Sequence, residues 1–324
     1  MKKIATQTIN GKAFEYSLLR NIYNRLKEKT SISIIQSAAY TTAKYCYDDF
    51  KPLGQQSFDM TASAAINTLI DLEPRLTHGL GPSDTLQLEI VADAEGQSGD
   101  VRDVLAIRSL QKWEIGISAK NNHRAVKHSR LSRDIDFGEK WLNSPCSAKY
   151  FSEIKNIFDQ LHEFKVNSKS TKKWSSLPNY HETVYLPILH AFKSEMLRIY
   201  ELHPDDTACN LVNYLIGNQD FYKVIKGRNK VEIEAYNLHG TLNQSFNNIK
   251  PLYNTKKIKL PDKLIDISLV KNSKTTLIVT LNEGWQISFR IHNASSRIEP
   301  SLKFDINLVS SPNAMFRHTL SVSN

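Results

Sequence analysis

The chain lacks the long apolar run, roughly 20 residues, that crosses a bilayer, so the sequence predicts no membrane span. It also lacks a secretory signal, because the two lysines after Met1 are not followed by an apolar segment. Cysteine is scarce: Cys46, Cys146 and Cys209 are far apart and form no CxxC pair. This spacing supports neither a disulfide framework nor a zinc site. We therefore expect a cytoplasmic protein whose cysteines are reduced and buried.

Acidic residues are in the minority. The 324 residues include 42 Lys and Arg against 33 Asp and Glu, and the formal net charge is +9. A basic surface favours a polyanionic partner, although it also serves solubility alone. Between Arg108 and Arg133 there are seven basic residues and one acid, Glu114. This segment therefore concentrates positive potential at one place in the sequence.

The N-terminal part of the chain has the apolar periodicity of helices, followed by the pattern of strands. An apolar stripe predicts an amphipathic helix over 12–28, and helices are also expected over 36–50 and 58–72. Three short, β-branched segments then predict consecutive strands over 84–93, 101–109 and 112–120. Further helices are expected over 147–165, 181–202 and 205–216.

After residue 228 the sequence predicts strands again, separated by turn residues. We expect a helical core over 1–228 and a β-rich region over 229–324 fused to it. The boundary stays open, because "KGRN" at 226–229 would also fit a hairpin turn. The fold class is therefore α/β, with helices and strands mixed, and no internal repeat is visible.

Two acidic residues and a lysine come together in two of the expected strands. Side chains alternate along a strand, so Lys120 shares one face with Glu114 and Ser118, while the apolar residues between them face the core. Asp103 lies in the preceding expected strand, and Asp100 lies just before that strand. A hairpin can therefore place both carboxylates near the ammonium group.

This grouping suits hydrolysis of a phosphodiester, in which developing charge must be neutralised and hydroxide supplied. Mg²⁺ binds one or two carboxylates, keeps most of its waters and accepts phosphate oxygens. A lysine beside it can orient the water or stabilise the pentavalent phosphate. The structural alternative is a turn role for Asp100 and a solvated strand end for Lys120. Asp103 would then pair with Arg102 or Arg108.

Several segments resemble the HaeIII-type Type II restriction endonucleases, a branch of the PD-(D/E)xK nuclease superfamily. They are GDVRDV, EIGISAK, NNHRAVKHSRLS and DFGEKW, and the likeness extends to RIHNASSRIEPSLKFDINLV at 290–309. A likeness in two separate regions, 99–141 and 290–309, is more specific than one short motif. The resemblance implies a restriction-endonuclease-like central mixed sheet flanked by helices, with additional antiparallel β structure towards the C-terminus.

The resemblance also implies the activity, which is Mg²⁺-dependent cutting of both strands of DNA at a short palindrome, GGCC. In this interpretation 1–228 is the helical and catalytic nuclease core and 229–324 the β-rich DNA-recognition region. A two-fold site is most simply cut by a homodimer. A restriction enzyme further implies a cognate DNA methyltransferase.

The superfamily motif assigns roles to the residues of the expected hairpin. Asp103, or Asp100, would be the first metal carboxylate, and Lys120 the catalytic lysine. Ser118 stands at the catalytic position of the middle acid, where a hydroxyl cannot hold a cation as a carboxylate does. Another acid is therefore expected to act there.

For this missing acid we favour Glu114, on the same strand face, and Asp136, as a metal ligand from a later helix. Other acids that could approach are Glu89, Asp134 and Glu139. Two alternatives stay open: a DNA-binding protein that has lost catalysis, and a nuclease of another specificity.

The basic run after Lys120 suits phosphate contacts. The residues expected to bind DNA there are Asn122, His123, Arg124, Lys127, His128 and Arg130. A loop near the C-terminus supplies the residue types that read G·C pairs, and its candidates are Arg297, Glu299 and Lys303. Each set has a plain alternative, a solvated loop for the first and hairpin chemistry for the second. A His-Asn-His nuclease centre is a further alternative for the first set, but its strand and helix pattern is missing.

Overall fold

The computed structural model describes residues 6–92, 100–122, 125–166, 173–293 and 295–322. The chain forms two compact units. Unit 1 comprises residues 1–124, 218–258 and 314–324, and unit 2 comprises residues 125–217 and 259–313. Each unit is therefore assembled from segments that are far apart in the sequence.

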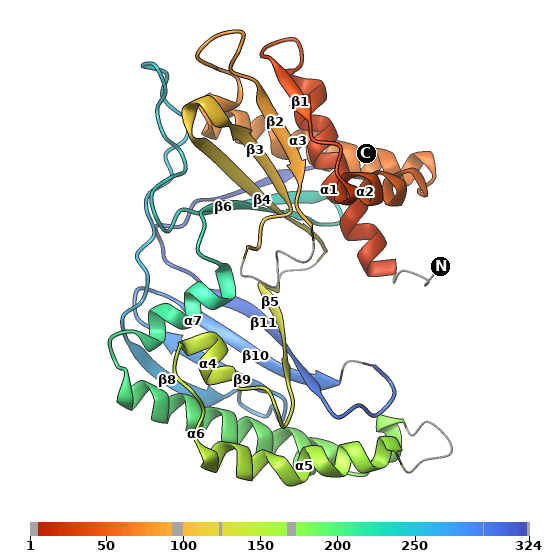
Figure 1. The fold of residues 1–324 in the computed structure, drawn as a ribbon, viewed down its shortest axis with the longest axis vertical. Helices are drawn as coiled ribbons and strands as arrows, with labels where there is room; N and C mark the ends of the chain where they lie inside the picture. Colours follow the sequence, from red (N-terminus) through yellow and green to blue (C-terminus); the bar gives the residue numbers. More distant parts are fainter. Residues whose placement is uncertain (1–5, 93–99, 123–124, 167–172, 294, 323–324) are drawn as a thin grey trace. The chain divides into compact units, whose positions relative to one another are not determined.

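Unit 1 is built on a mixed seven-stranded sheet with the order β1-β2-β3-β4-β6-β7-β12. The pairs β1·β2 and β4·β6 are parallel, and the other neighbours are antiparallel. The helices of the unit lie alongside this sheet (Figure 1). Its strands are β1 (Ile32–Ile34), β2 (Leu86–Ile90), β3 (Val104–Arg108), β4 (Trp113–Asn121), β6 (Phe221–Lys226), β7 (Lys230–Tyr236) and β12 (Arg317–Ser321). Its helices are α1 (Thr6–Leu26), α2 (Ala38–Asp48) and α3 (Pro52–Leu72).

The core of unit 1 lies between α1 and one face of the sheet. The apolar stripe of α1, with Phe14 and Leu18, is buried together with Val104 of β3 and Ile115 and Ile117 of β4. Strand alternation directs the neighbours of these residues to the opposite face. The apolar side of β4 is thus the core side, as the sequence predicts.

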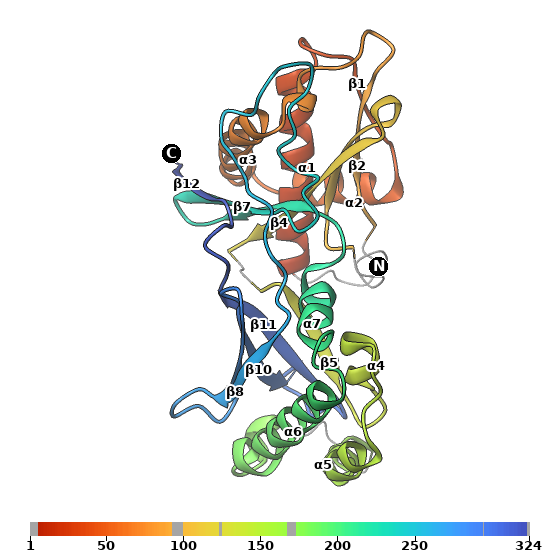
Figure 2. The ribbon, with the colours of Figure 1, turned by 90° about the vertical axis from the view of Figure 1, so that its left-hand side faces the viewer.

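Unit 2 is built on an antiparallel five-stranded sheet with the order β5-β11-β10-β9-β8. Its helices gather on one side of this sheet, as Figure 2 shows. The strands are β5 (Lys127–Leu131), β8 (Leu264–Leu269), β9 (Thr276–Leu281), β10 (Gln286–Asn293) and β11 (Leu302–Ser310). The helices are α4 (Phe137–Leu142), α5 (Ala148–Val166), α6 (Leu186–Leu202) and α7 (Thr207–Ile216).

The expected fold class is confirmed: a mixed sheet flanked by helices is accompanied by a separate antiparallel sheet. The predicted helices and the three strands before residue 121 are present, with ends that differ by a few residues. Elements that the sequence analysis missed are β1, β5, β6, β12 and α4. In the described parts of the chain, no helix is long and apolar enough to cross a membrane.

The division expected at residue 228 is wrong, because this point is the turn of a hairpin. Gly227 N donates to Lys230 O at 2.8 Å, and β6 and β7 pair on either side of it. β12 also returns to unit 1, where it pairs with β7. The parallel pair β4·β6 is joined through residues 125–217, which form much of unit 2. The chain therefore leaves unit 1 and comes back to it, so one cut in the sequence does not separate the units.

Candidate active site

Asp103 is fixed by its backbone at the start of β3. Its N–H donates to Ile117 O at 2.8 Å, and its carbonyl accepts from Val91 N at 3.0 Å. Val104 of β3 pairs with Ile117 of β4 and with Ile90 of β2. The two bonds of Asp103 therefore extend the pairing of β3 with both neighbouring strands by one residue. The position of the Asp103 side chain is therefore set by the sheet.

Three donors of β4 converge on one oxygen of this carboxylate. Asp103 Oδ2 accepts from Ala119 N at 2.7 Å, from Ser118 Oγ at 3.3 Å and from Lys120 Nζ at 3.3 Å. The side chains of Asp103 and Lys120 are 23% and 26% exposed, so solvent screens this pair only in part. Oδ1 of Asp103 has no hydrogen bond from any described residue, and it can accept a cation or water. The hairpin thus brings Asp103, Ser118 and Lys120 together.

A second carboxyl group, on α1, interacts electrostatically with Asp103. Glu15 is buried, and its Oε2 accepts from Lys12 Nζ at 2.9 Å. Burial and the negative charge of Asp103 together raise the pKa of Glu15 to about 7, although Lys12 and Lys120 act in the opposite direction. A buried carboxyl next to a second acid is under-compensated, and a cation between the two would relieve this.

The sequence analysis missed Glu15, although a signal was present. Glu15 precedes Leu18, Leu19 and Ile22 by three, four and seven positions, which places it on the apolar stripe of its own helix. An acid on a buried helical face needs a partner or a function. Its direct partner, Lys12, lies in the same helix, but the charges of Asp103 and Lys120 that also act on it belong to a hairpin far along the sequence, which periodicity within one helix does not reveal.

Asp100 and Glu114 are placed differently from Asp103. Both pair with Arg102: Nη2 lies 2.7 Å from Asp100 Oδ2, and Nη1 lies 2.6 Å from Glu114 Oε1. Although burial acts to raise it, the hydrogen bonds from Arg102 hold the pKa of Asp100 below its ordinary value. A Cβ at Gly116 would lie 2.0 Å from Arg102 Cδ, so glycine lets the arginine cross β4. These two acids already have a counterion, and neither contacts Lys120 among the residues described.

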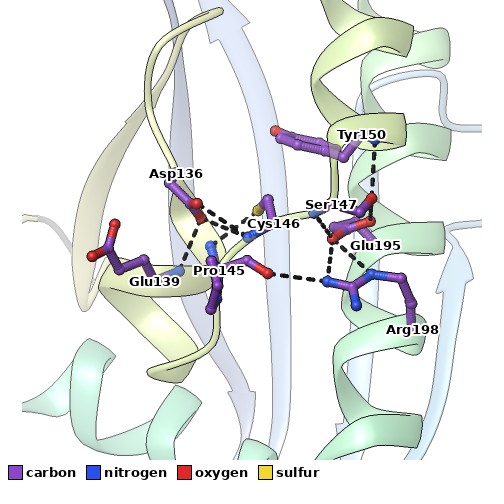
Figure 3. A network of polar contacts seen from close by, with 9 residues as sticks. Asp136, Glu139, Pro145, Cys146, Ser147, Tyr150, Glu195 and Arg198 are labelled. Atoms are coloured by element: carbon purple, nitrogen blue, oxygen red, sulfur yellow. Dashed lines mark hydrogen bonds and ion pairs between the residues drawn. The ribbon is translucent and has the colours of Figure 1, made fainter.

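Asp136 belongs to unit 2, where it caps α4. Its Oδ1 accepts from Glu139 N at 2.9 Å and from Cys146 N at 3.0 Å (Figure 3). Burial opposes the effect, but these backbone donors hold the pKa of Asp136 below its ordinary value. The carboxylate is thus engaged in a local polar network. This network continues through Ser147, which donates to Glu195 of α6.

The other acids considered for the missing position are scattered. Glu89 lies on β2 opposite Leu105, and Asp134 and Glu139 are exposed in unit 2. The described residues contain no group of three or more His, Cys, Asp and Glu side chains that could hold a metal ion. Asp100 and Asp103 belong to unit 1 and Asp136 to unit 2, so their grouping around one metal stays a prediction.

The residues expected to bind DNA are found in several environments. His123 and Arg124 lie outside the described residues, and Asn122 is exposed in unit 1, with its N–H bonded to Lys226 O at 2.7 Å. Lys127 points inwards: its Nζ donates to Tyr214 O at 2.7 Å and lies 3.8 Å from the ring centroid of Tyr214. Burial lowers the pKa of Lys127 to about 8. The expected phosphate contact of Lys127 is at odds with this orientation.

The remaining expected DNA contacts lie together in unit 2. His128 and Arg130 are exposed on β5, and Lys303 is the cross-strand neighbour of Arg130 on β11. Glu299 Oε2 lies 3.8 Å from Arg130 Nη1. Arg297 is exposed in the loop before β11. These residues therefore occupy one part of one unit.

An aspartate before one strand and a lysine at the end of the next, in a mixed sheet flanked by helices, define a protein of the restriction-endonuclease-like class. The sequence model of the family described as HaeIII restriction endonuclease matches residues 11–312. The Type II restriction enzyme HaeIII of Haemophilus aegyptius is 40% identical over 305 residues, which cover 94% of each chain. No solved structure gave a significant match. The chain belongs to the HaeIII restriction endonuclease family and is a site-specific deoxyribonuclease.

Proposed function

We propose that this enzyme cuts both strands of DNA at GGCC by Mg²⁺-dependent hydrolysis, and that its active centre is formed by Asp103, Glu15 and Lys120. The observation that carries the proposal is the convergence of Ala119 N, Ser118 Oγ and Lys120 Nζ on Asp103 Oδ2. The specificity for GGCC is inferred from the resemblance to HaeIII.

The residues present fit a magnesium ion. Mg²⁺ is usually held by one or two carboxylates and keeps several waters, and Asp103 and Glu15 supply two carboxyl groups. Oδ1 of Asp103 has no donor among the described residues, and burial together with the Asp103 charge raises the pKa of Glu15 to about 7. Both features are those of a site that a cation completes. The second metal carboxylate is therefore proposed to be Glu15 in place of Asp100 or Asp136.

The chain's own groups have separate tasks in this proposal. Ala119 N holds the Asp103 carboxylate in one orientation, and Lys120 places an ammonium group beside it. From there Lys120 donates a hydrogen bond to the attacking water or to a phosphate oxygen as negative charge develops. When bound, Mg²⁺ acts as a Lewis acid and lowers the pKa of a coordinated water.

Other parts of the proposal rest on the family and on charge. A homodimer would give each strand of the palindrome one active centre. His128, Arg130, Arg297, Glu299 and Lys303 are proposed DNA contacts, and a cognate methyltransferase would protect the host sites.

Digestion of a sequenced plasmid tests the proposal. Wild type with Mg²⁺ should give the fragments of a GGCC map, and chelation should stop cutting. Lys120→Ala should bind the site within a few-fold of wild type and cut at least about a hundredfold more slowly, since the ammonium group acts mainly in the transition state. Lys112, exposed just before β4, supplies the control: Lys112→Ala should cut like wild type.

Two outcomes would contradict the proposal. Equal cutting by wild type and Lys120→Ala would remove Lys120 from the active centre. Retardation of DNA in a gel without any fragments, with Mg²⁺ present, would favour the non-catalytic DNA-binding protein.

A further inference from the structure

The five-stranded sheet of unit 2 has one covered face. Phe289 of β10 and Phe304 of β11 are fully buried, and both lie within ring contact of Phe192 of α6, at centroid distances of 5.6 and 5.0 Å. Trp141 of α4 packs on the same two rings. The helices therefore cover this face, as Figure 2 shows. Alternation along each strand directs the neighbouring residues to the opposite, open face.

Three adjacent strands place ionisable side chains side by side on the open face. Asp305 of β11 pairs in register with His128 of β5 and with Arg290 of β10. Its Oδ2 lies 2.9 Å from Arg290 Nη2, and its Oδ1 lies 3.5 Å from His128 Nδ1. The Asp305 side chain is 17% exposed, whereas those of Arg290 and His128 are 55% and 47% exposed. The acid is thus recessed and its two partners project into solvent.

Cations outnumber acids on three strands of this face, β5, β11 and β10, whereas the edge strand β8 contributes an exposed acid, Asp266. Arg130 of β5 and Lys303 of β11 are direct cross-strand neighbours. Like charges in such positions destabilise a sheet, so this pair does not serve stability. Glu299, 3.8 Å from Arg130, offsets the charge in part. A binding partner with repeated negative charge would relieve the repulsion.

The width of the sheet decides which part of DNA it can meet. Strands lie about 4.8 Å apart, so five strands span roughly 19 Å. The major groove is only about 12 Å wide. The face as a whole therefore does not enter the groove, and a central residue such as Arg290 on β10 is better placed to meet phosphates than base edges.

We propose that the open face of the five-stranded sheet binds the phosphodiester backbone of the DNA, with Arg290 as a phosphate contact and Asp305 as the residue that positions Arg290 and His128. The inference rests on DNA being the substrate, and it names the surface that holds it. Neither Arg290 nor Asp305 belongs to the proposed active centre in unit 1.

The test replaces each member of the Arg290–Asp305 ion pair in turn. If the face binds phosphates, loss of Arg290 weakens DNA binding and loss of the Asp305 charge strengthens it. If the pair is merely structural, the two substitutions change DNA binding in the same direction. Binding of the full-length protein to a GGCC duplex and to a duplex without the site is measured in chelator over a range of salt. Arg290→Gln should weaken both duplexes by the same factor and reduce the salt slope by about 0.9, the value for one phosphate contact. Asp305→Asn, which keeps a hydrogen-bond acceptor for Arg290, should bind both duplexes more tightly.

The matched control is a similar ion pair in the same unit. Arg133 Nη1 lies 2.7 Å from Asp159 Oδ1 of α5, on the helical side of the unit, and the Arg133 side chain is 46% exposed. Arg133→Gln and Asp159→Asn should leave the salt slope unchanged. Arg290→Lys should restore the slope lost in Arg290→Gln, which separates loss of charge from misfolding.

Three results would overturn the inference: an unchanged slope in Arg290→Gln, a loss confined to the GGCC duplex, or weaker binding by both Arg290→Gln and Asp305→Asn. Cutting of plasmid by wild type is scored separately. If wild type does not cut, the proposed function fails, but the salt slopes still test the proposed DNA-binding surface. With cutting and an unchanged slope, only the proposed surface fails.

Discussion

In unit 1, the side chains of Asp103 and Lys120 are 23% and 26% exposed. On the open face of the sheet in unit 2, the side chains of Arg290 and His128 are 55% and 47% exposed. At this point of unit 1, two acids, Asp103 and Glu15, lie with two lysines, Lys120 and Lys12. On the open face of unit 2, cations outnumber acids along β5, β11 and β10. The two sheets thus differ in how far their charged side chains are exposed.

This difference teaches how the two tasks of a nuclease can be separated. Partly buried charges interact strongly and at short range, so a few acids in unit 1 suffice for a cation and its chemistry. Exposed cations act through a screened, longer-range field, which suits a polyanion of any sequence. Function in unit 1 should therefore depend steeply on single residues, and function in unit 2 should depend on salt.

The largest expected effect is on the rate of cutting, and it is tested by an Asp→Asn substitution in each unit. Asp103→Asn removes a carboxylate from the proposed metal site and should lower the rate of plasmid cutting about a thousandfold. Asp159→Asn, on α5 of unit 2, loses only surface partners and should cut like wild type. The measurement is single-turnover cutting at saturating enzyme. Equal rates for wild type and Asp103→Asn would erase the distinction between the two sheets.

A smaller effect is expected in stability, at an acid of unit 2. Asp136→Ala removes the cap of α4 and the acceptor of Cys146 N, and should lower the free energy of unfolding by about 1 kcal/mol, measured by urea denaturation. The control Asp134→Ala, two residues earlier in the chain and exposed, should change it by less than about 0.5 kcal/mol. An Asp136→Ala protein with unchanged stability and a higher Mg²⁺ requirement would return Asp136 to the metal site.

The fold was predictable where the pattern is local. The helices before residue 73, the strands around Asp103 and Lys120, and the apolar face of β4 follow from periodicity within one element. β5 escaped prediction because its sequence, KHSRL, is polar on the open face and buries only Ser129 and Leu131 on the other. The interleaving of the units was also out of reach, because the pairing of β4 with β6 is made across residues 125–217.

The candidate site was predictable in part for the same reason. One hairpin contains both Asp103 and Lys120, so spacing alone suggested their contact, and the distance of 3.3 Å confirms it. Whether Asp100 faced this pair depended on the side chain of Arg102, which binds Asp100 and Glu114 instead. Glu15 belongs to α1, far before Asp103 in the sequence, and only tertiary packing reveals that the two acids interact.

The Mg²⁺ requirement of Glu15→Gln tests the central claim, that Asp103 and Glu15 hold the cation, most directly. Gln keeps the size of the side chain and an acceptor for Lys12 but loses the charge, so half-maximal cutting should need at least about tenfold more Mg²⁺ than in wild type. Glu28→Gln, at an exposed position just beyond the end of the same helix, should leave the requirement unchanged. A Glu15→Gln enzyme with the Mg²⁺ dependence of wild type would contradict the account.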